Sequence, residues 1–199
     1  MKAYSRGQTF AFVGISGSGK GTQAKLLINH LKKNGCKDIL YIYTGDLFRS
    51  LSKQKFLAGR IIKDDLANGR LPAEWIASYL WEAKLVKELK NAETTIIFDG
   101  SPRRIREIKD MEEVLGWFNR EKLYLIYLKL SRKSASSRLK SRGREDDTDA
   151  NINQRINWFY ESVEPIISRF KAEDPEHLIE LDGEKTIAAI HEDLKSFLK

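Results

Sequence analysis

The chain has 199 residues, long enough to bury a substantial core and of the size expected for one compact domain. Its formal charge is +7, but the basic residues are interleaved with acids along amphipathic patterns, which favours a solvated surface over a nucleic-acid partner. The single cysteine, Cys36, excludes internal disulfides and a multi-cysteine zinc site, so we expect a reducing, cytoplasmic setting. No segment approaches the roughly 20 apolar residues of a membrane span, and we expect no membrane anchor.

Short runs of β-branched and aromatic residues alternate with longer helical patterns along the chain. Runs such as Thr95-Ile96-Ile97-Phe98 are almost wholly apolar, which is typical of strands buried on both faces. This alternation predicts an α/β fold, with a five-stranded parallel sheet flanked by helices and ligands at the carboxyl ends of the strands. The predicted strands run from Thr9 to Val13, Ile39 to Tyr43, Thr94 to Phe98, Leu123 to Leu128 and His177 to Leu181.

The first predicted strand leads into a glycine-rich loop, Gly14-Ile15-Ser16-Gly17-Ser18-Gly19-Lys20-Gly21-Thr22, and then into a helical pattern. Such a P-loop aims backbone N–H groups and a helix N-terminus at phosphate oxygens, and Lys20 adds a mobile positive charge. A chance glycine-rich turn is the alternative, disfavoured by the flanking strand and helix. The loop therefore predicts a nucleoside triphosphate site. Most P-loops carry Ser or Thr where this chain has Gly21, so another residue is expected to hold the metal.

Two stretches interrupt the alternation of strands and helices. Between about Thr44 and Trp75, short helical segments are punctuated by glycine and proline, which indicates a small helical insertion. Between about Arg138 and Ala150, the sequence is too charged for a strand or a core helix and indicates a flexible flap. We therefore expect a single domain over residues 1–199, with a core of residues 1–43, 75–137 and 151–199, an insertion at about 44–74 and a short lid at about 138–150.

Three further motifs follow the P-loop in order: Thr44-Gly45-Asp46-Leu47-Phe48-Arg49, Asp99-Gly100-Ser101-Pro102-Arg103 and Arg142-Gly143-Arg144-Glu145-Asp146-Asp147. Together the four motifs resemble the adenylate kinase family of nucleoside monophosphate kinases. The resemblance extends from about Thr9 to the C-terminal helix and includes Glu164-Pro165-Ile166-Ile167. It implies a P-loop kinase that transfers a phosphoryl group from ATP, with magnesium, to a nucleoside monophosphate.

The resemblance also implies a set of site residues. Phosphoryl transfer depends on positioning and charge neutralisation, which arginine and lysine supply, although any one of these arginines could be a surface charge. The flap arginines reach the phosphates only if the flap closes, which would also exclude water. ATP binding is implied for Gly17, Ser18, Gly19, Lys20, Gly21, Thr22, Arg138 and the backbone at Lys185. Monophosphate binding is implied for Thr44, Arg49, Gly69, Arg70, Leu71, Gly100, Arg103, Glu107, Arg144 and Arg155. Catalytic roles are implied for Lys20, Arg103, Arg138, Arg142, Arg144 and Arg155.

Acidic residues near these motifs have two interpretations each. Asp99 ends a buried strand, where an unpaired carboxylate would be costly, so we expect it to hold magnesium through water or to pair with the P-loop. The alternative for Asp99 is a turn cap without a metal. Asp146 and Asp147 either pair with the flap arginines or cap the next helix. We assign this pair no chemistry.

The chain departs from the family pattern at several places. Only Gly143 separates Arg142 from Arg144, so the lid is very short and cannot carry structural zinc. Ser101 replaces the usual aromatic residue. Glu107 stands where adenylate kinases carry a glutamine that reads adenine; a carboxylate only accepts hydrogen bonds, so the base preference stays open. Thr44 favours AMP, because uridylate and cytidylate kinases of the family tend to have a smaller residue there.

The remaining conspicuous residues favour structural roles. The histidines lack ligand spacing, and the aromatic groups Trp75-Tyr79-Trp81 and Trp158-Phe159-Tyr160 follow helical patterns typical of a core or an interface. The first hypothesis is a monomeric kinase acting on ATP and AMP. The alternatives are the same reaction on GMP, UMP or CMP, an ATP-switched nucleic-acid-binding protein, and a nucleotide sensor without catalysis.

Overall fold

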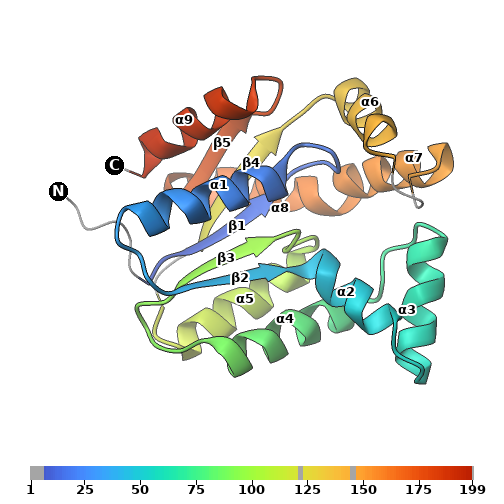
Figure 1. The fold of residues 1–199 in the computed structure, drawn as a ribbon, viewed down its shortest axis with the longest axis horizontal. Helices are drawn as coiled ribbons and strands as arrows, with labels where there is room; N and C mark the ends of the chain where they lie inside the picture. Colours follow the sequence, from blue (N-terminus) through green and yellow to red (C-terminus); the bar gives the residue numbers. More distant parts are fainter. Residues whose placement is uncertain (1–6, 121–122, 144–146, 199) are drawn as a thin grey trace.

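The protein is described by a computed structural model over residues 7–120, 123–143 and 147–198. Its centre is a parallel sheet in the order β2-β3-β1-β4-β5, so the P-loop strand β1 lies in the middle (Figure 1). The predicted five-stranded α/β fold is therefore confirmed. The strands are β1 (Thr9–Val13), β2 (Ile39–Tyr43), β3 (Thr95–Asp99), β4 (Leu123–Lys129) and β5 (Leu178–Asp182).

Three strands differ from the predicted ranges. β3, β4 and β5 each end one residue later, at Asp99, Lys129 and Asp182, and β3 and β5 also begin one residue later, at Thr95 and Leu178. The prediction ended each strand at its last apolar residue, but backbone pairing continues: Asp99 lies in register with both Phe12 and Tyr43. As a result, the Asp99 carboxylate is held at the carboxyl edge by two neighbouring strands.

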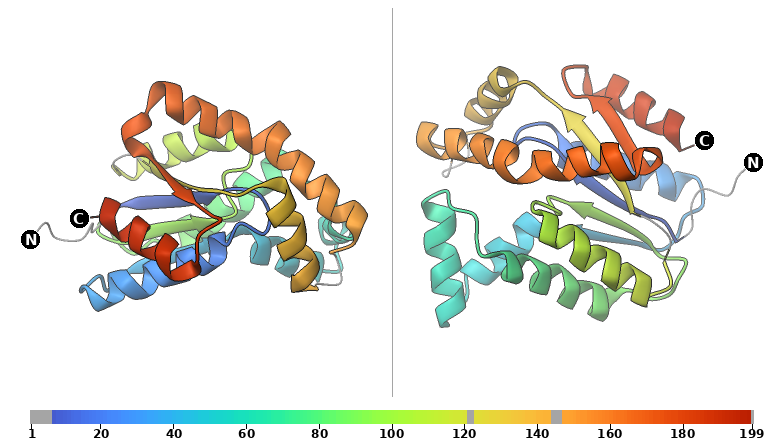
Figure 2. Two further views of the ribbon diagram at one scale, coloured as in Figure 1. Left: turned by 90° about the horizontal axis from the view of Figure 1, so that it is seen from above. Right: turned by 180° about the vertical axis from the view of Figure 1, so that it is seen from behind.

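Helices cover both faces of the sheet, as the two views of Figure 2 show. On one face lie α1 (Lys20–Lys33) and α9 (Ile187–Phe197); on the other lie α4 (Glu74–Glu88), α5 (Ile105–Trp117) and α8 (Glu164–Glu173). Alternate residues of β1 serve the two layers, since Phe10 and Phe12 pack with α1 and α9 whereas Ala11 and Val13 pack with the other helices. No helix in the described ranges is both long and apolar enough to cross a membrane.

The segment between β2 and α4 forms two helices, α2 (Thr44–Ser52) and α3 (Leu57–Ala67), which lie beside the carboxyl edge (Figure 1). It has a small apolar cluster of its own, in which Phe48 and Ile62 pack against Ile76 and Ala77 at the start of α4. This separate cluster allows the segment to hold its shape outside the main core.

Beyond β4 the chain forms α6 (Arg132–Arg142), α7 (Asp149–Trp158), a π-helical turn (Phe159–Val163) and then α8. A 3₁₀ turn over Pro175–His177 precedes β5. The Thr148 hydroxyl accepts a hydrogen bond from the Asn151 N–H and caps α7. Of the predicted core or interface aromatics, Trp81 and Phe159 are buried, whereas Trp75 and Tyr79 are exposed.

One buried arginine, Arg120, fastens the opposite, amino edge of the sheet. It is 9% exposed and follows α5. Its guanidinium donates to the carbonyl oxygens of Gly7 (2.8 Å), Gln8 (3.2 Å), Ala92 (3.1 Å) and Thr94 (2.6 Å), and to the Thr9 hydroxyl (3.3 Å). These oxygens lie just before or at the start of β1 and β3, so one side chain joins the beginnings of two central strands.

Candidate active site

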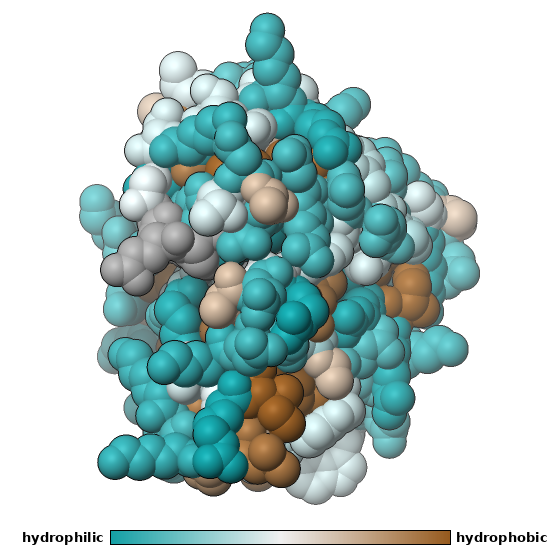
Figure 3. Space-filling model, turned by 90° about the vertical axis from the view of Figure 1, so that its right-hand side faces the viewer, coloured by the Kyte–Doolittle hydropathy of each residue, from teal (hydrophilic) through white to brown (hydrophobic). Residues whose placement is uncertain are grey.

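A cavity of about 670 Å³ opens at the carboxyl edge of the sheet. It is lined by the P-loop, α2, the loop that follows α3, and residues of α6 and α7. Figure 3 shows that the molecular face presenting α3 and α7 is largely hydrophilic, with a smaller hydrophobic group toward its lower end. Among the described lining residues, eight are cationic (Lys20, Lys25, Arg49, Arg70, Arg103, Arg138, Arg142 and Arg155) and two are acidic (Asp46 and Asp99). This excess of positive charge suits a polyanionic ligand.

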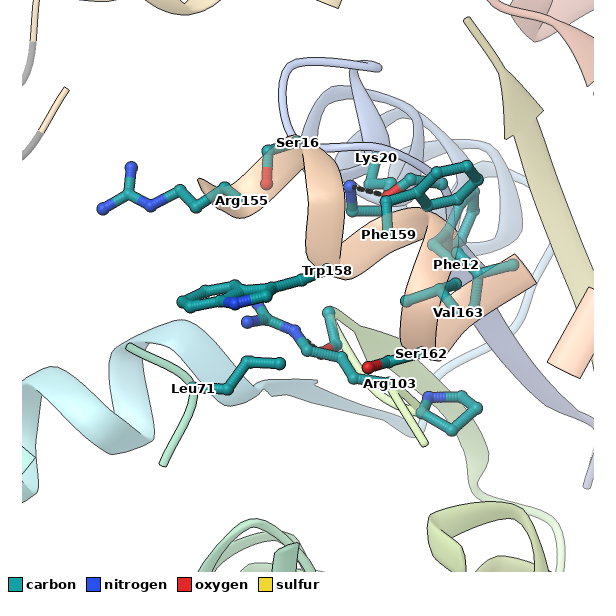
Figure 4. Close-up of a pocket in the computed structure, with 14 residues that line it drawn as sticks. Phe12, Ser16, Lys20, Leu71, Arg103, Arg155, Trp158, Phe159, Ser162 and Val163 are labelled. Carbon is teal, nitrogen blue, oxygen red and sulfur yellow. Dashed lines mark hydrogen bonds between the residues drawn. The ribbon is translucent and has the colours of Figure 1, made fainter. Parts of the chain in front are cut away.

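The P-loop starts directly after β1, with Gly14 close to Leu128 of β4, and its last residues, Lys20 to Thr22, form the first turn of α1. A Cβ atom on Gly14 would lie 2.6 Å from the Leu128 carbonyl oxygen, so only glycine fits this close approach. Gly19, at φ 95°, precedes α1 in a left-handed conformation that glycine adopts readily. The Lys20 Nζ atom donates to the carbonyl oxygen of Gly14 at 2.7 Å (Figure 4) and to that of Ile15 at 2.9 Å. Burial lowers the pKa of Lys20 to about 8, although Asp99 acts in the opposite direction.

Asp99 lies beside the P-loop, with its carboxylate facing Gly21. A Cβ atom on Gly21 would lie 3.0 Å from Asp99 Oδ2, and the Tyr41 hydroxyl donates to the same oxygen at 2.7 Å. Burial and the Asp99 charge raise the pKa of Tyr41, which therefore stays a donor. One cavity-lining carboxylate next to a phosphate loop fits a magnesium ion that keeps several waters and takes phosphate oxygens as further ligands. The hydrogen bond from Tyr41 was not predicted from the sequence.

Arg103 points its guanidinium along the cavity wall. Its Nε atom donates to the Gly100 carbonyl oxygen at 2.8 Å, and within the described ranges no carboxylate lies within ion-pair distance of it. Burial lowers its pKa. Arg49, by contrast, pairs with Asp46 at 2.5 Å and stacks 5.1 Å from the Tyr43 ring centre. Arg103 is therefore the more open of the two toward an incoming anion.

Two other lining arginines share one buried carboxylate. Arg142 binds Asp147 through Nε (2.9 Å) and Nη2 (2.7 Å), and Arg155 binds it through Nη1 (2.8 Å). The Asp147 side chain is 1% exposed, and the helix cap falls to Thr148. For Asp147, pairing with arginines is therefore the interpretation that the structure favours. Arg144, together with Asp146, lies outside the described residues.

The residues that the resemblance assigns to the donor base differ in where they lie. Arg138 lines the cavity, and its Nη2 atom donates to the Gly183 carbonyl oxygen at 2.9 Å. Lys185 directs its Nζ atom to Asp193 on α9 at 2.8 Å and is absent from the cavity lining. The predicted contact was with the backbone of Lys185, and the direction of its side chain leaves that prediction unchanged.

On the acceptor side, the structure brings part of the predicted set to the cavity. Gly69, Arg70, Leu71 and Gly100 line it together with Arg49, Arg103 and Arg155. Arg70 pairs with Asp64 and Asp65. Thr44 and Glu107, predicted monophosphate-binding residues that bear on the choice of base, are 1% and 2% exposed and do not line the cavity. They lie behind its wall in this conformation.

Trp158 lines the cavity but was predicted to be a core or interface residue. Figure 4 shows its indole ring in the same pocket as Arg103, Arg155 and Leu71. The spacing of three residues between Arg155 and Trp158 places them on one face of α7 and was the available sequence signal. The insertion approaches the same helix, because a Cβ atom on Gly69 would lie 2.4 Å from Asn151 Oδ1.

The histidines, for which structural roles were predicted, are not among the residues that line the cavity. His30 and His191 face one another with ring centres 6.0 Å apart, and His177 Nδ1 lies 2.6 Å from Asp174 Oδ1. Among the described residues, Asp174, Glu176 and His177 form a possible metal-binding group. It lies at the beginning of β5, at the sheet edge opposite the cavity, and its Asp174 and His177 are already paired.

Comparison with known proteins agrees with this combination of fold and cavity. The sequence profile of the family described as adenylate kinase matches residues 12–175. The adenylate kinase of Prochlorococcus marinus (strain MIT 9301) is 30% identical over 184 residues, covering 92% of this chain and 94% of that protein. Adenylate kinase 1 of Nostoc sp. is 29% identical, covering 94% and 96%. The adenylate kinase of Campylobacter lari is 30% identical, covering 96% of each chain. With a P-loop on the central strand and arginines converging beside it, the chain belongs to the adenylate kinase family of phosphotransferases.

Proposed function

We propose that this enzyme transfers the terminal phosphoryl group of ATP to AMP and forms two molecules of ADP. The observation that carries the proposal is the cavity in which eight cationic side chains converge beside a P-loop. Two nucleotides that meet end to end bring several phosphate groups to one place, and such a site requires this excess of positive charge. The names of the relatives, all adenylate kinases, support AMP as the acceptor.

On the donor side, the backbone N–H groups of residues 17–22 hold the phosphates of ATP. Lys20 exchanges its bonds to the Gly14 and Ile15 carbonyl oxygens for phosphate oxygens. Arg138 and the backbone at Lys185 contact the adenine. Asp99 holds magnesium through water, and the ion, when bound, neutralises charge on the phosphates.

On the acceptor side, Arg103 and Arg49 grip the monophosphate. A guanidinium fits two phosphate oxygens at once, and Arg103 has its terminal nitrogens available for that geometry. Gly69, Arg70 and Leu71 of the insertion, residues 44–74, face the acceptor nucleoside. Arg142, Arg144 and Arg155 neutralise the transferred group, and Asp147 holds two of these three arginines in place.

The lid, residues 138–150, closes over the donor phosphates when both nucleotides are bound. Closure excludes water, which would otherwise accept the phosphoryl group and hydrolyse ATP. No side chain is needed as a covalent nucleophile, because the acceptor phosphate attacks directly and the protein supplies alignment and charge. We also propose that the enzyme is a cytoplasmic monomer; the single, buried cysteine supports the reducing compartment.

The second candidate is the same reaction on GMP, UMP or CMP, which the glutamate at position 107 favours. Diphosphate formation from ATP and magnesium should be compared with AMP, GMP, UMP and CMP as acceptors. We expect AMP to have the highest kcat/KM, Lys20→Met to abolish turnover, and EDTA to suppress it. A higher kcat/KM with another monophosphate would reassign the acceptor. Salt-sensitive binding of RNA or DNA without diphosphate formation would instead support an ATP-switched nucleic-acid-binding protein.

A further inference from the structure

A closed polar network lies behind the cavity wall, between the β2–α2 junction and the start of α5. The hydroxyl oxygens of Thr44 and Ser101 are 2.7 Å apart, and the Ser101 side chain also bonds to the Glu107 carboxylate. The backbone N–H of Arg103 donates to Glu107 Oε2 at 2.9 Å. The side chains of this network are almost completely buried, at 1% exposure for Thr44, 0% for Ser101 and 2% for Glu107.

The charge state of Glu107 sets the direction of each bond. Above its pKa the ionised carboxylate only accepts, so the Ser101 hydroxyl then donates to Glu107 and the Thr44 hydroxyl donates to Ser101. Glu107 is the third residue of α5, where acidic side chains commonly turn back to bond a free N–H at the helix start. Here that N–H belongs to Arg103, so the first turn of α5 holds the loop that carries this arginine.

In this network the Glu107 carboxylate forms its hydrogen bonds with the protein rather than with a ligand. Its carboxylate accepts from two groups of the 101–103 loop, and Arg103 in turn bonds back to the Gly100 carbonyl oxygen through Nε. We propose that Glu107 is a positioning residue that fixes the Arg103 backbone so that the guanidinium faces the acceptor phosphate, and that it does not read the acceptor base. Ser101 and Thr44 extend this support to the start of α2, the helix that carries Arg49. The inference rests on the proposed function of the same cavity.

The hydrogen bonds of Ser101 to Thr44 and Glu107 explain the serine at this position, which the sequence alone did not. An aromatic residue at position 101 could neither donate to Glu107 nor accept from Thr44, and both would keep unmet polar groups in a buried site. The phosphate is common to all nucleoside monophosphates. A residue that acts through Arg103 therefore changes the affinity for every acceptor by the same factor, whereas a residue that reads the base changes their ratio.

Two substitutions at position 107 separate these outcomes, with binding of AMP and GMP measured by titration calorimetry and KM by kinetics. The amide oxygen of Glu107→Gln can still accept from the Arg103 N–H, so we expect affinities within about threefold and an unchanged AMP-to-GMP ratio. Glu107→Met leaves that N–H without a partner, and we expect about tenfold weaker binding of both nucleotides with an unchanged KM for ATP. A change of about tenfold or more in the AMP-to-GMP ratio in Glu107→Gln would overturn the inference.

A double substitution tests whether the effect passes through Arg103. In an Arg103→Met background the guanidinium is already lost, so adding Glu107→Met should raise the acceptor KM by no more than about threefold further. A full tenfold effect in that background would show that Glu107 contacts the acceptor independently and would refute the positioning role. Kinetics at high acceptor concentration make this weakly binding background measurable.

The pH dependence of the acceptor KM separates a positioning role from a merely structural one. Burial raises the pKa of Glu107 to about 7, while the Arg103 N–H, the nearby Arg103 and Arg104 charges and the Ser101 hydroxyl act against this shift. The wild-type acceptor KM should therefore rise as pH falls below about 7, relative to Glu107→Gln, which lacks this titration. Because the acceptor phosphate titrates equally in both proteins, only the difference between the profiles is informative. Identical profiles would contradict the inference.

Glu113→Gln is the matched control, since Glu113 is an exposed glutamate on the same helix. Melting temperatures identify any variant that fails to fold; if Glu107→Met does so, Ser101→Ala replaces it, with a uniform loss of about threefold expected for AMP and GMP. Failure of the proposed function has a different signature. If the wild-type chain neither binds nor phosphorylates any monophosphate, the function itself is refuted, whereas a base-selective effect in Glu107→Gln refutes the positioning role alone.

Discussion

The two edges of the sheet each hold an arginine whose charge is desolvated by the surrounding protein, and the two side chains are used differently. At the amino edge, Arg120 donates to five oxygens of the chain segments that begin β1 and β3. At the carboxyl edge, the guanidinium of Arg103 donates to one backbone oxygen, that of Gly100. Burial lowers the pKa of both. The two residues thus share their type and the direction of their pKa shift, and they differ in the number of N–H donors that already have a partner.

This difference distinguishes structural cations from ligand-binding ones. A guanidinium has five N–H donors, so Arg120 has little capacity left for an external partner, whereas Arg103 keeps most of its capacity and lines the cavity. By the number of N–H donors that already have a partner, Arg49 and Arg70, which pair with neighbouring acids, lie between Arg103 and Arg120. Exposed pairs of this kind are weak, and phosphate oxygens can displace them.

The largest effect that would test the comparison is on turnover. Arg103→Met should lower kcat/KM for AMP by about 10³-fold, because the acceptor phosphate loses its most available charged partner. Its free energy of unfolding should change by less than about 1 kcal/mol, since a single backbone hydrogen bond is lost. A phosphotransfer assay and urea denaturation measure the two quantities. Arg106→Met, at an exposed position of α5, is the control. Strong destabilisation by Arg103→Met would show that Arg103 is structural.

At the amino edge we expect the reverse result. Arg120→Met leaves several buried carbonyl oxygens without donors and should lower the free energy of unfolding by about 3 kcal/mol. The folded fraction should keep its kcat, because the site lies at the other edge. Arg120→Lys should recover part of the stability, since an ammonium group supplies three donors. Lost turnover with unchanged stability would mean that the two edges are not independent.

The comparison also shows how far the sequence could predict this molecule. The strands and the P-loop were predictable because their signals are local: an apolar run buried on both faces, and glycines between a strand and a helix. The hydrogen bonds of Arg120 require the segments around residues 7–9 and 92–94 to lie side by side in the fold, and no local sequence pattern predicts this proximity.

The candidate site divides in the same way. The resemblance identified arginines that the structure places around the cavity, including Arg103 and Arg155. It could not show that Glu107 turns back toward the Arg103 N–H, because the direction of a side chain at a helix start depends on the loop before it. It could not separate Trp158 from Phe159 either, since which neighbour faces the core is set by the packing of α7 and the following π-helical turn.

Lys20 is a third cation at the carboxyl edge, and its role can be tested through pH. Burial lowers its pKa from 10.5 to about 8, so the free enzyme loses this charge as pH rises past 8, while the arginines stay protonated. We expect kcat/KM for ATP to fall by about tenfold per pH unit above 8. At saturating ATP the phosphates stabilise the ammonium, so kcat should fall only at higher pH. A kcat/KM that stays flat to pH 9.5 would contradict this account.

For stability the effect of pH has the opposite sign. The unfolded chain binds the Lys20 proton more tightly than the folded chain, so the contribution of Lys20 to the unfolding free energy increases between pH 8 and 10.5.

The smallest expected effect is a change in the fluorescence of Trp158, which lies at the carboxyl edge. Its ring shares a pocket with Arg103 and Arg155, so an arriving phosphate changes the charge around the indole. AMP alone should therefore change the tryptophan emission of the wild-type protein, and Trp158→Phe should abolish the change while altering the acceptor KM by no more than about threefold, because a ring is retained. Trp117→Phe is the matched control: Trp117 is 76% exposed at the end of α5, and its loss should leave the response intact. A response that survives Trp158→Phe would mean that the phosphate does not arrive between these arginines, and the distinction between the two edges would then rest on Arg103 alone.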